Sequence, residues 1–342
     1  MLVAVSDPVG LTQVGGTMRA AWYERTGAAR DVLVVGEMSV AEPGPGEVRV
    51  ALRASGVNPS DVKARAGSRP MLAPRIIPQS DGAGVIEGVG SGVPSDLVGE
   101  RVWIWNGQWK RPLGTCAQFI TLPAEQATAM PERLTFEEAA CLGIPALTAY
   151  RALATDGGVR GKVVLVTGGA GAVGHYAVQM AKLMGAARVI TTVSTPAKAA
   201  HARSAGADEI INYKTENVAE RVRDLTGGRG VERVVEVDIA GNIGLYPAIM
   251  ARDGLISAYG SNSQEIRLLF SPLILTGAAI RFFIVYELTP EVRREAIEQL
   301  TRWINAKQLQ HAVAACYPLD SIVDAHEAVE RGTHIGNVVV TL

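Results

Sequence analysis

The spacing of apolar and polar positions differs between two parts of the chain. The first third has short apolar segments separated by glycine and proline, at 18–23, 47–57, 82–90, 100–105 and 117–123. This pattern is typical of strands joined by turns and predicts a β-rich, barrel-like domain. From about residue 145, strand-like and helix-like segments alternate. That alternation predicts a doubly wound parallel sheet, so the fold class is α/β.

The C-terminal third predicts one more strand and a long helix. The segment Ala278 to Glu287 is an apolar strand at the expected sheet edge, where it would pair with a twofold-related copy and form a homodimer. A helix follows, with Thr289 as its N-cap and Pro290 at its first position. The chain then returns to a strand over 335–342, and residues 1–17 are interpreted as a loose N-terminal extension.

Composition narrows the classes of function. The chain has 342 residues, 48% of them apolar, and a formal net charge of −1 without a long run of one sign. It therefore lacks the basic stripe of a nucleic-acid-binding protein, a polybasic membrane anchor and a membrane-spanning run. The three cysteines are far apart and odd in number, which favours a reducing cytoplasmic location over a disulfide framework.

A glycine-rich stretch after one apolar strand carries the first chemical signal. Gly169, Gly171 and Gly174 satisfy G-x-G-x-x-G between the strand at 163–166 and a helical pattern. The first glycine is expected to permit the tight turn, the second to let the backbone approach a pyrophosphate and the third to allow close helix packing. With the intervening Ala172 and Val173, this motif predicts a dinucleotide site at a helix N-terminus.

The next two strands predict which dinucleotide binds. A site for NAD places Asp or Glu about 20 residues beyond the fingerprint, where this chain has Ser194. Lys198 follows four residues later and Tyr213 ends the third strand. A hydroxyl and an ammonium group suit a 2′-phosphate, which a carboxylate would repel. The expected cofactor is therefore NADPH.

Several motifs, in this order, resemble one known family. "VNPSDVKARAG", "PQSDGAGVIEGVG", "CLGIPALTAYRAL" and "GKVVLVTGGAGAVGHYAVQMAK" resemble the medium-chain dehydrogenase/reductase superfamily, in its zinc-independent quinone oxidoreductase (zeta-crystallin-like) branch. The resemblance implies a GroES-like catalytic domain of residues 18–144 and 286–342 around a Rossmann domain of 145–285. Ala172 departs from the branch, which often has a further glycine there.

The resemblance also bears on metal. Zinc alcohol dehydrogenases of this superfamily have a cysteine where this chain has Asn58, and a His-Glu pair near the "PQSDGAG" segment, which has no histidine. The four close cysteines of a structural zinc lobe are also missing, since only Cys116 lies between residues 90 and 130. Without a Lewis acid, an easily reduced acceptor such as a quinone or conjugated enone is the expected substrate.

The candidate catalytic residues are Asn58, Ser60 and Asp61, on the turn after the strand at 47–57. By resemblance, Asn58 donates its amide to the substrate carbonyl or holds the nicotinamide side of the pocket, and Ser60 matches a proton-relay hydroxyl. The same four residues, Asn-Pro-Ser-Asp, also suit a helix start whose side chains bond their own backbone. Many quinone reductases of the branch have a tyrosine where this chain has Lys63. Thr148 resembles a threonine that lies beside the nicotinamide.

Three classes of function remain open at this point. The first is an NADPH-dependent reductase of quinones or enones, acting by hydride transfer in a cleft between the domains. The second is an alcohol dehydrogenase or an enoyl-thioester reductase on the same scaffold. The third is a protein that binds NADPH without catalysis. The missing zinc ligands and the "VNPSD" turn favour the first.

Overall fold

In the computed structural model, which describes residues 16–342, the chain divides into two units with separate cores. The first unit holds residues up to Gly143, together with Ala315–His334 and Val338–Leu342. The second unit holds Ile144–Ala314 and Ile335–Asn337. The expected N-terminal extension, 1–17, lies outside the described residues except for its last two, and the first strand begins at Thr17.

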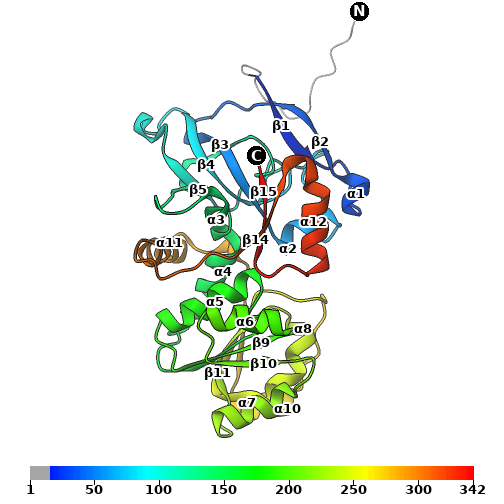
Figure 1. Cartoon of the computed structure of the whole chain (residues 1–342), viewed down its shortest axis with the longest axis vertical. Coiled ribbons are helices and arrows are strands. Elements are labelled where there is room, and N and C mark those ends of the chain that lie inside the picture. The colour runs from blue at the N-terminus through cyan, green and yellow to red at the C-terminus, as the bar shows by residue number, and fades with distance from the viewer. Residues whose placement is uncertain (1–15) are drawn as a thin grey trace, which may run out of the picture. The chain divides into compact units, whose positions relative to one another are not determined.

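The first unit is built mainly from strands (Figure 1). Its strands are β1 (Thr17–Trp22), β2 (Val34–Ser39), β3 (Glu47–Val57), β4 (Asp81–Val89), β5 (Arg101–Ile104), β6 (Phe119–Pro123), β7 (Ala127–Ala129), β14 (Val313–Pro318) and β15 (Asn337–Thr341). Its α-helices are α1 (Ala29–Val32), α2 (Pro59–Arg65), α3 (Phe136–Ala139) and α12 (Ile322–Arg331), and its 3-10 turns are η1 (Ser95–Leu97), η2 (Ala124–Gln126) and η6 (Leu319–Ser321).

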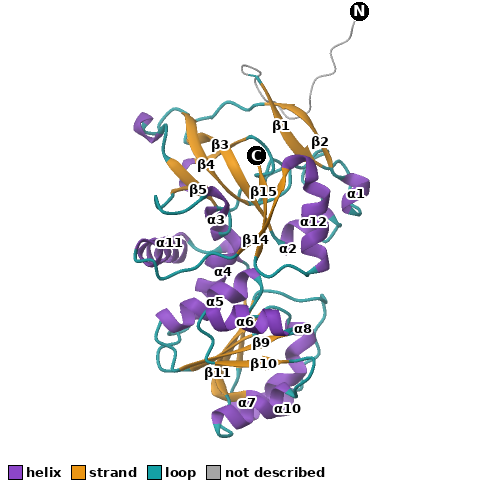
Figure 2. Cartoon of the chain, viewed as in Figure 1, coloured by secondary structure: helices purple, strands orange, loops and turns teal. Residues whose placement is uncertain are grey.

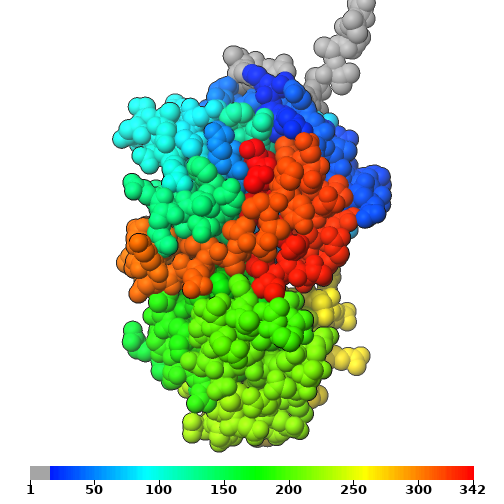
Figure 3. Space-filling model, viewed as in Figure 1, coloured from blue at the N-terminus to red at the C-terminus, as the bar shows by residue number. Residues whose placement is uncertain are grey.

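Strand β3 organises this unit. It pairs antiparallel with β4, β6 and β15 in a sheet of order β14-β15-β3-β4-β5-β7, and its alternate residues Val48, Val50 and Leu52 are buried, as the sequence pattern predicts. Because β15 and α12 come from the C-terminal end, the last residues of the chain complete a unit that the first residues begin. In Figure 3 these C-terminal segments, orange to red, lie against the blue N-terminal residues.

The second unit alternates strands and helices. Its strands are β8 (Val163–Val166), β9 (Arg188–Val193), β10 (Glu209–Asn212), β11 (Val231–Glu236), β12 (Met250–Ala258) and β13 (Ala279–Phe282). Its helices are α4 (Leu147–Ala154), α5 (Ala172–Leu183), α6 (Pro196–Ser204), α7 (Val218–Thr226), α8 (Ile239–Asn242), η4 (Ile243–Leu245), α9 (Tyr246–Ile249), α10 (Phe270–Thr276), η5 (Val285–Glu287) and α11 (Pro290–Asn305). The π-helix η3 (Leu142–Ala146) precedes α4.

The predicted doubly wound sheet is confirmed. Six parallel strands lie in the order β10-β9-β8-β11-β12-β13, and helices cover both faces (Figure 2). The strand order reverses between β8 and β11. In sheets of this kind, ligands bind at that switch point, beyond the carboxyl ends of the strands.

The end of the second unit differs from the sequence prediction. The strand predicted over 278–287 is only β13, because the chain turns at η5, where the Arg293 guanidinium donates to the carbonyls of Val285 and Tyr286. Thr289 caps α11 as predicted, accepting from the Val292 N–H.

Residues 286–314, predicted to belong with the catalytic domain, instead pack in the second unit. Helix α11 packs on α4 there, and Tyr150 donates to Glu295 at 2.8 Å. The return to the first unit therefore begins only at Ala315.

Candidate functional site

The turn between β8 and α5 depends on glycine at several positions. Gly168 has a φ of 69°, in the left-handed region. A Cβ on Gly169 would lie 2.0 Å from Thr191 Oγ1, and one on Gly174 would lie 2.2 Å from the Gly168 carbonyl oxygen. The tight turn was predicted at Gly169. The structure corrects this, because the left-handed residue is Gly168 and Gly169 is required instead by the close approach of β9.

The other residues of the glycine motif, from Gly171 to Val173, are exposed or partly exposed. Gly171 is exposed and caps α5, and a Cβ placed there would meet nothing closer than 3.4 Å. Ala172 and Val173, in the first turn of α5, are partly exposed, and this turn contains no acidic residue. The first N–H groups of a helix have no partner within it and attract anions. This cradle therefore fits a dinucleotide diphosphate.

Two of the three residues predicted to select NADPH follow neighbouring strands at one edge of the sheet, and the third lies in the helix after the first of these strands. Ser194 and Tyr213 directly follow the neighbouring strands β9 and β10, and the Tyr213 N–H donates to the Val193 carbonyl at 3.1 Å. The Tyr213 side chain is 48% exposed. Lys198 lies in the first turn of α6, where its N–H donates to the capping Thr195 hydroxyl at 3.2 Å.

A hollow of about 590 Å³ opens on the other side of the switch point, at the ends of β12 and β13. The lining residues are Ile239, Ala258, Tyr259, Gly260, Ser261, Ser263, Gln264, Ile266, Phe282, Phe283 and Ile284. The loop that forms one wall is held in place by Asp238, whose carboxylate accepts the Asn262 N–H and side-chain amide, both at 2.8 Å. Thr148, predicted to lie beside the nicotinamide, is buried on α4 of the same unit.

In the first unit, Asn58 is the N-cap of α2 and is buried. Its side-chain Nδ2 donates to Asp81 Oδ2 at 2.8 Å, and its backbone N–H donates to Asp61 Oδ2 at 2.8 Å. A carboxylate only accepts, so Asp81 fixes which end of the Asn58 amide faces it. Ser60, in the first turn of α2, is partly buried.

Asp61 therefore serves as the capping partner of Asn58, the alternative to a catalytic role that the Asn-Pro-Ser-Asp sequence predicts. The carboxyl group is buried, and Asp61 Oδ1 has no hydrogen-bond partner among the described residues. Burial raises the pKa of Asp61 to about 7, although the Asn58 N–H and the positive charge of Arg69 favour the ionised form.

Buried polar side chains form hydrogen bonds around Asp81, the partner of Asn58. The Ser55 hydroxyl hydrogen-bonds with Gln79 and with Thr115, the latter at 2.7 Å, and Thr115 donates to the Asp81 carbonyl at 2.7 Å. Gln79 has a φ of 76° and its Nε2 lies 3.4 Å from His326 Nε2. The strand that begins at Asp81 is thus anchored by hydrogen bonds to β3 and α12.

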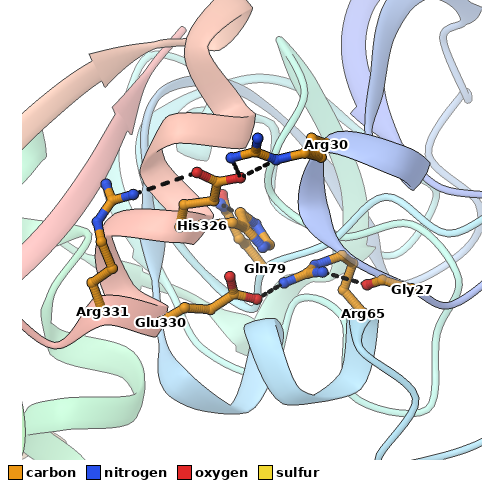
Figure 4. A network of polar contacts seen from close by, with 8 residues as sticks. Gly27, Arg30, Arg65, Gln79, His326, Glu330 and Arg331 are labelled. Atoms are coloured by element: carbon orange, nitrogen blue, oxygen red, sulfur yellow. Dashed lines mark hydrogen bonds and ion pairs between the residues drawn. The ribbon is translucent and has the colours of Figure 1, made fainter.

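Helix α12 is tied to α2 through the same region (Figure 4). The fully buried Arg65 pairs with Glu330 and donates to the Gly27 carbonyl. The pKa of His326 is lowered to about 3, first by burial and further by Arg65. His326 is therefore neutral at physiological pH and acts as a hydrogen-bonding group rather than a charge.

Sequence reasoning missed Asp81, Gly168 and the Asp238–Asn262 pair. Asp81 stands in the quoted "PQSDGAG" segment, and a carboxylate among small residues at the start of an apolar strand was an available signal for a buried acceptor. Within residues 16–342, no three His, Cys, Asp or Glu side chains gather as ligands for a metal ion. None of the described helices has the length and apolar character needed to cross a membrane.

Comparison with known proteins matches both units. Residues 44–146 fit the model of the alcohol dehydrogenase GroES-like domain, and residues 172–305 fit that of zinc-binding dehydrogenases. The chain is 33% identical to a 2-haloacrylate reductase from Burkholderia sp, over 91% of this chain and 95% of that protein. It is 31% identical to quinone oxidoreductase 1 of Escherichia coli, over 91% of this chain and 96% of that one.

A solved structure of a mycobacterial protein complexed with NADPH has a similar fold. It superimposes with a TM-score of 0.85 at 32% identity, over 95% of this chain and all of that one. The similarity thus extends through both units in sequence and in structure.

Proposed function

The chain belongs to the medium-chain dehydrogenase/reductase superfamily, with quinone oxidoreductases among its relatives, and we propose that it reduces a quinone or conjugated enone with NADPH and without a metal ion. The observation that carries this proposal is the hydrogen bond from the Asn58 amide to Asp81. Asn58 stands at the position where zinc alcohol dehydrogenases have a cysteine ligand. An amide held by a carboxylate supplies a hydrogen-bond donor instead of a thiolate, which suits an acceptor that needs only its oxygen stabilised.

The second unit supplies the cofactor side. When bound, the reduced nicotinamide provides a hydride. The turn from Gly168 to Gly174 holds the diphosphate on backbone N–H groups, and Ser194, Lys198 and Tyr213 receive the 2′-phosphate. The hollow at the ends of β12 and β13, together with Thr148 of the same unit, would receive the nicotinamide half. The NADPH complex of the mycobacterial relative supports this choice of cofactor.

The first unit holds the residues that we propose act on the acceptor. One Nδ2 hydrogen of Asn58 is bonded to Asp81, and the other is donated to the acceptor oxygen as negative charge develops there. Asp61 positions Asn58 through the backbone N–H, and Ser60 relays a proton. The acceptor gains one hydride and one proton in total, and NADPH becomes NADP⁺. The relatives named for quinone and 2-haloacrylate reduction both act on electron-poor, conjugated acceptors.

A panel of acceptors tests the proposal. Purified protein is mixed with NADPH and with quinones, enones, enoyl thioesters or, in the reverse direction, alcohols and NADP⁺, each with and without a chelator. Quinones or enones should be reduced at rates that the chelator leaves unchanged, and elemental analysis should find no stoichiometric zinc. Turnover only of alcohols and only with zinc would identify a dehydrogenase of the metal-dependent kind. NADPH binding without turnover of any acceptor would identify a non-catalytic protein.

We also propose a homodimer formed through β13. This strand is at the edge of the sheet, its last residue Phe282 is 59% exposed, and Ile284, two residues beyond it, is 46% exposed. An exposed apolar edge strand favours pairing with a twofold-related copy. Light scattering at micromolar concentration should report twice the chain mass, and a monomer would refute this assembly.

A further inference from the structure

Arg69, four residues beyond the end of α2, carries a charge that lacks a close counter-ion. Among residues 16–342, no carboxylate lies within ion-pair distance of its guanidinium. The neighbouring arginines of the same segment differ, because Arg65 pairs with Glu330 and Arg75 pairs with Glu24 at 2.7 Å. A partly buried guanidinium without a carboxylate partner favours binding an anion from outside the chain.

The Arg69 side chain is held in a defined place. Its Nη2 donates to Gln108 Oε1 at 2.7 Å, and its guanidinium carbon lies 5.4 Å from the centre of the Trp109 ring. Gln108 is buried and is itself fixed, since its Nε2 donates to the Arg111 carbonyl at 3.0 Å. Because an arginine fork has five N–H donors, the bond to Gln108 leaves others to bind a ligand.

Contacts within the first unit connect Arg69 to the acceptor side of the site. The Gly107 N–H, beside Gln108, donates to the Ser80 carbonyl at 2.9 Å, and Ser80 precedes the Asp81 that holds Asn58. The positive charge of Arg69 also lowers the pKa of Asp61, which caps the helix begun by Asn58. Hydrogen bonds and chain neighbours therefore link Arg69 to the segment that holds the Asn58 amide, and its charge acts on the Asp61 carboxyl group.

We propose that Arg69 binds a carboxylate on the acceptor, so that the preferred substrates are conjugated acids rather than neutral quinones. This assignment rests on the proposed hydride transfer to a conjugated acceptor. The planar fork of arginine matches a carboxylate in two hydrogen bonds, and the guanidinium already lies beside the Trp109 ring. Lys63, exposed on α2 where many quinone reductases have a tyrosine, adds a further positive charge to this segment.

The test compares two acceptors that differ in charge: trans-4-oxopent-2-enoate and its methyl ester, each reduced by NADPH. The wild-type protein should have a kcat/KM about tenfold or more higher for the acid. Arg69→Gln should lower kcat/KM for the acid by about ten- to a hundredfold, the range of a charge-assisted hydrogen bond, and leave the ester within about threefold. Its affinity for NADPH should be unchanged, which separates an acceptor carboxylate from a cofactor phosphate.

Arg75→Gln is the matched control, because its guanidinium is already paired with Glu24. It should leave the preference for the acid intact. An acid and an ester reduced equally well by the wild type, or a preference that survives Arg69→Gln, would overturn the assignment. A wild type that binds NADPH but reduces no quinone, ester or acid would instead refute the proposed function.

A measurement on the wild type alone covers the case in which Arg69→Gln fails to fold. The saturated acid 4-oxopentanoate should inhibit competitively against the acceptor, and its methyl ester should inhibit at least about tenfold more weakly. Equal inhibition by the two compounds would contradict a carboxylate subsite.

Discussion

The two units build their proposed functional groups in opposite ways. In the second unit, missing side chains let the glycine turn pack closely enough to present its backbone, since a Cβ on Gly169 or Gly174 would collide with β9 or with the turn itself. In the first unit, the functional group is a side chain, Asn58, held by the buried carboxylates of Asp61 and Asp81. The first arrangement presents backbone N–H groups, and the second presents one oriented amide.

This difference determines how each half tolerates change. A backbone cradle is lost when any added atom displaces the turn, so the damage is steric and affects cofactor binding. A side chain held by buried acceptors can be replaced without moving the backbone, so the damage is chemical and affects turnover. Variants in the two units should therefore separate binding of NADPH from catalysis.

Gly174→Ala should have the largest effect. The new Cβ would lie 2.2 Å from the Gly168 carbonyl oxygen, so the turn must move and the affinity for NADPH should fall by up to about 150-fold. Titration with NADPH and thermal unfolding measure this. Gly171→Ala is the control for packing, since its Cβ meets nothing closer than 3.4 Å. It should weaken binding while leaving the unfolding temperature near that of the wild type, and equal destabilisation by both variants would contradict the cradle.

Asn58→Ala should have the next largest effect, on turnover rather than binding. Removing one oriented donor from the developing oxyanion costs about 100-fold in kcat, while the affinity for NADPH should stay within about twofold. Steady-state kinetics with a quinone, together with NADPH titration, measures both quantities. Asp81→Asn should lower kcat in the same direction, because an amide at position 81 no longer fixes the orientation of Asn58. An unchanged kcat in both variants would show that this pair is structural.

Lys198→Ala tests the selection of the cofactor within the second unit. The wild type should bind NADPH about ten- to a hundredfold more tightly than NADH, and the variant should lose most of that difference with little change for NADH. Titration of both proteins with both nucleotides decides the matter. Equal wild-type affinities would overturn the choice of NADPH. A variant that keeps its preference would assign recognition of the phosphate to Ser194, Tyr213 or other residues.

The smallest expected effect concerns the pH dependence of stability in the first unit. The pKa of Asp61 is raised to about 7 in the folded chain, so the folded state holds a proton that the unfolded state has lost. Asp61 therefore makes the protein less stable as pH rises through 7. Between pH 6 and pH 8 the wild type should lose about 1.4 kcal/mol relative to Asp61→Asn, as linkage over one pKa unit gives.

Urea unfolding of both proteins at the two pH values measures this difference. Asparagine at position 61 can still accept the Asn58 N–H, so the cap itself is retained. Parallel pH dependence in the two proteins would show that Asp61 ionises normally in the folded state.

The sequence by itself determined the local parts of this protein. Alternation over 47–57, the glycine fingerprint and the Thr289-Pro290 start of α11 each depend on residues close together in the chain, and each is present where the pattern predicts. The fold class and the edge at which Ser194 and Tyr213 meet followed from the order of strands and helices. Periodicity and capping are local consequences of backbone geometry, which is why sequence alone could predict them.

Only the tertiary structure decided which buried polar groups meet. Asn58 and Asp81 are 23 residues apart, Arg69 and Gln108 are 39 apart, and Gln79 and His326 are 247 apart. No local pattern encodes such pairs, because each partner is fixed by the packing of strands and helices that bring distant segments together. The same packing explains three differences from the sequence prediction. Strand β13 ends at Phe282, helix α11 lies in the second unit, and the left-handed residue of the glycine turn is Gly168.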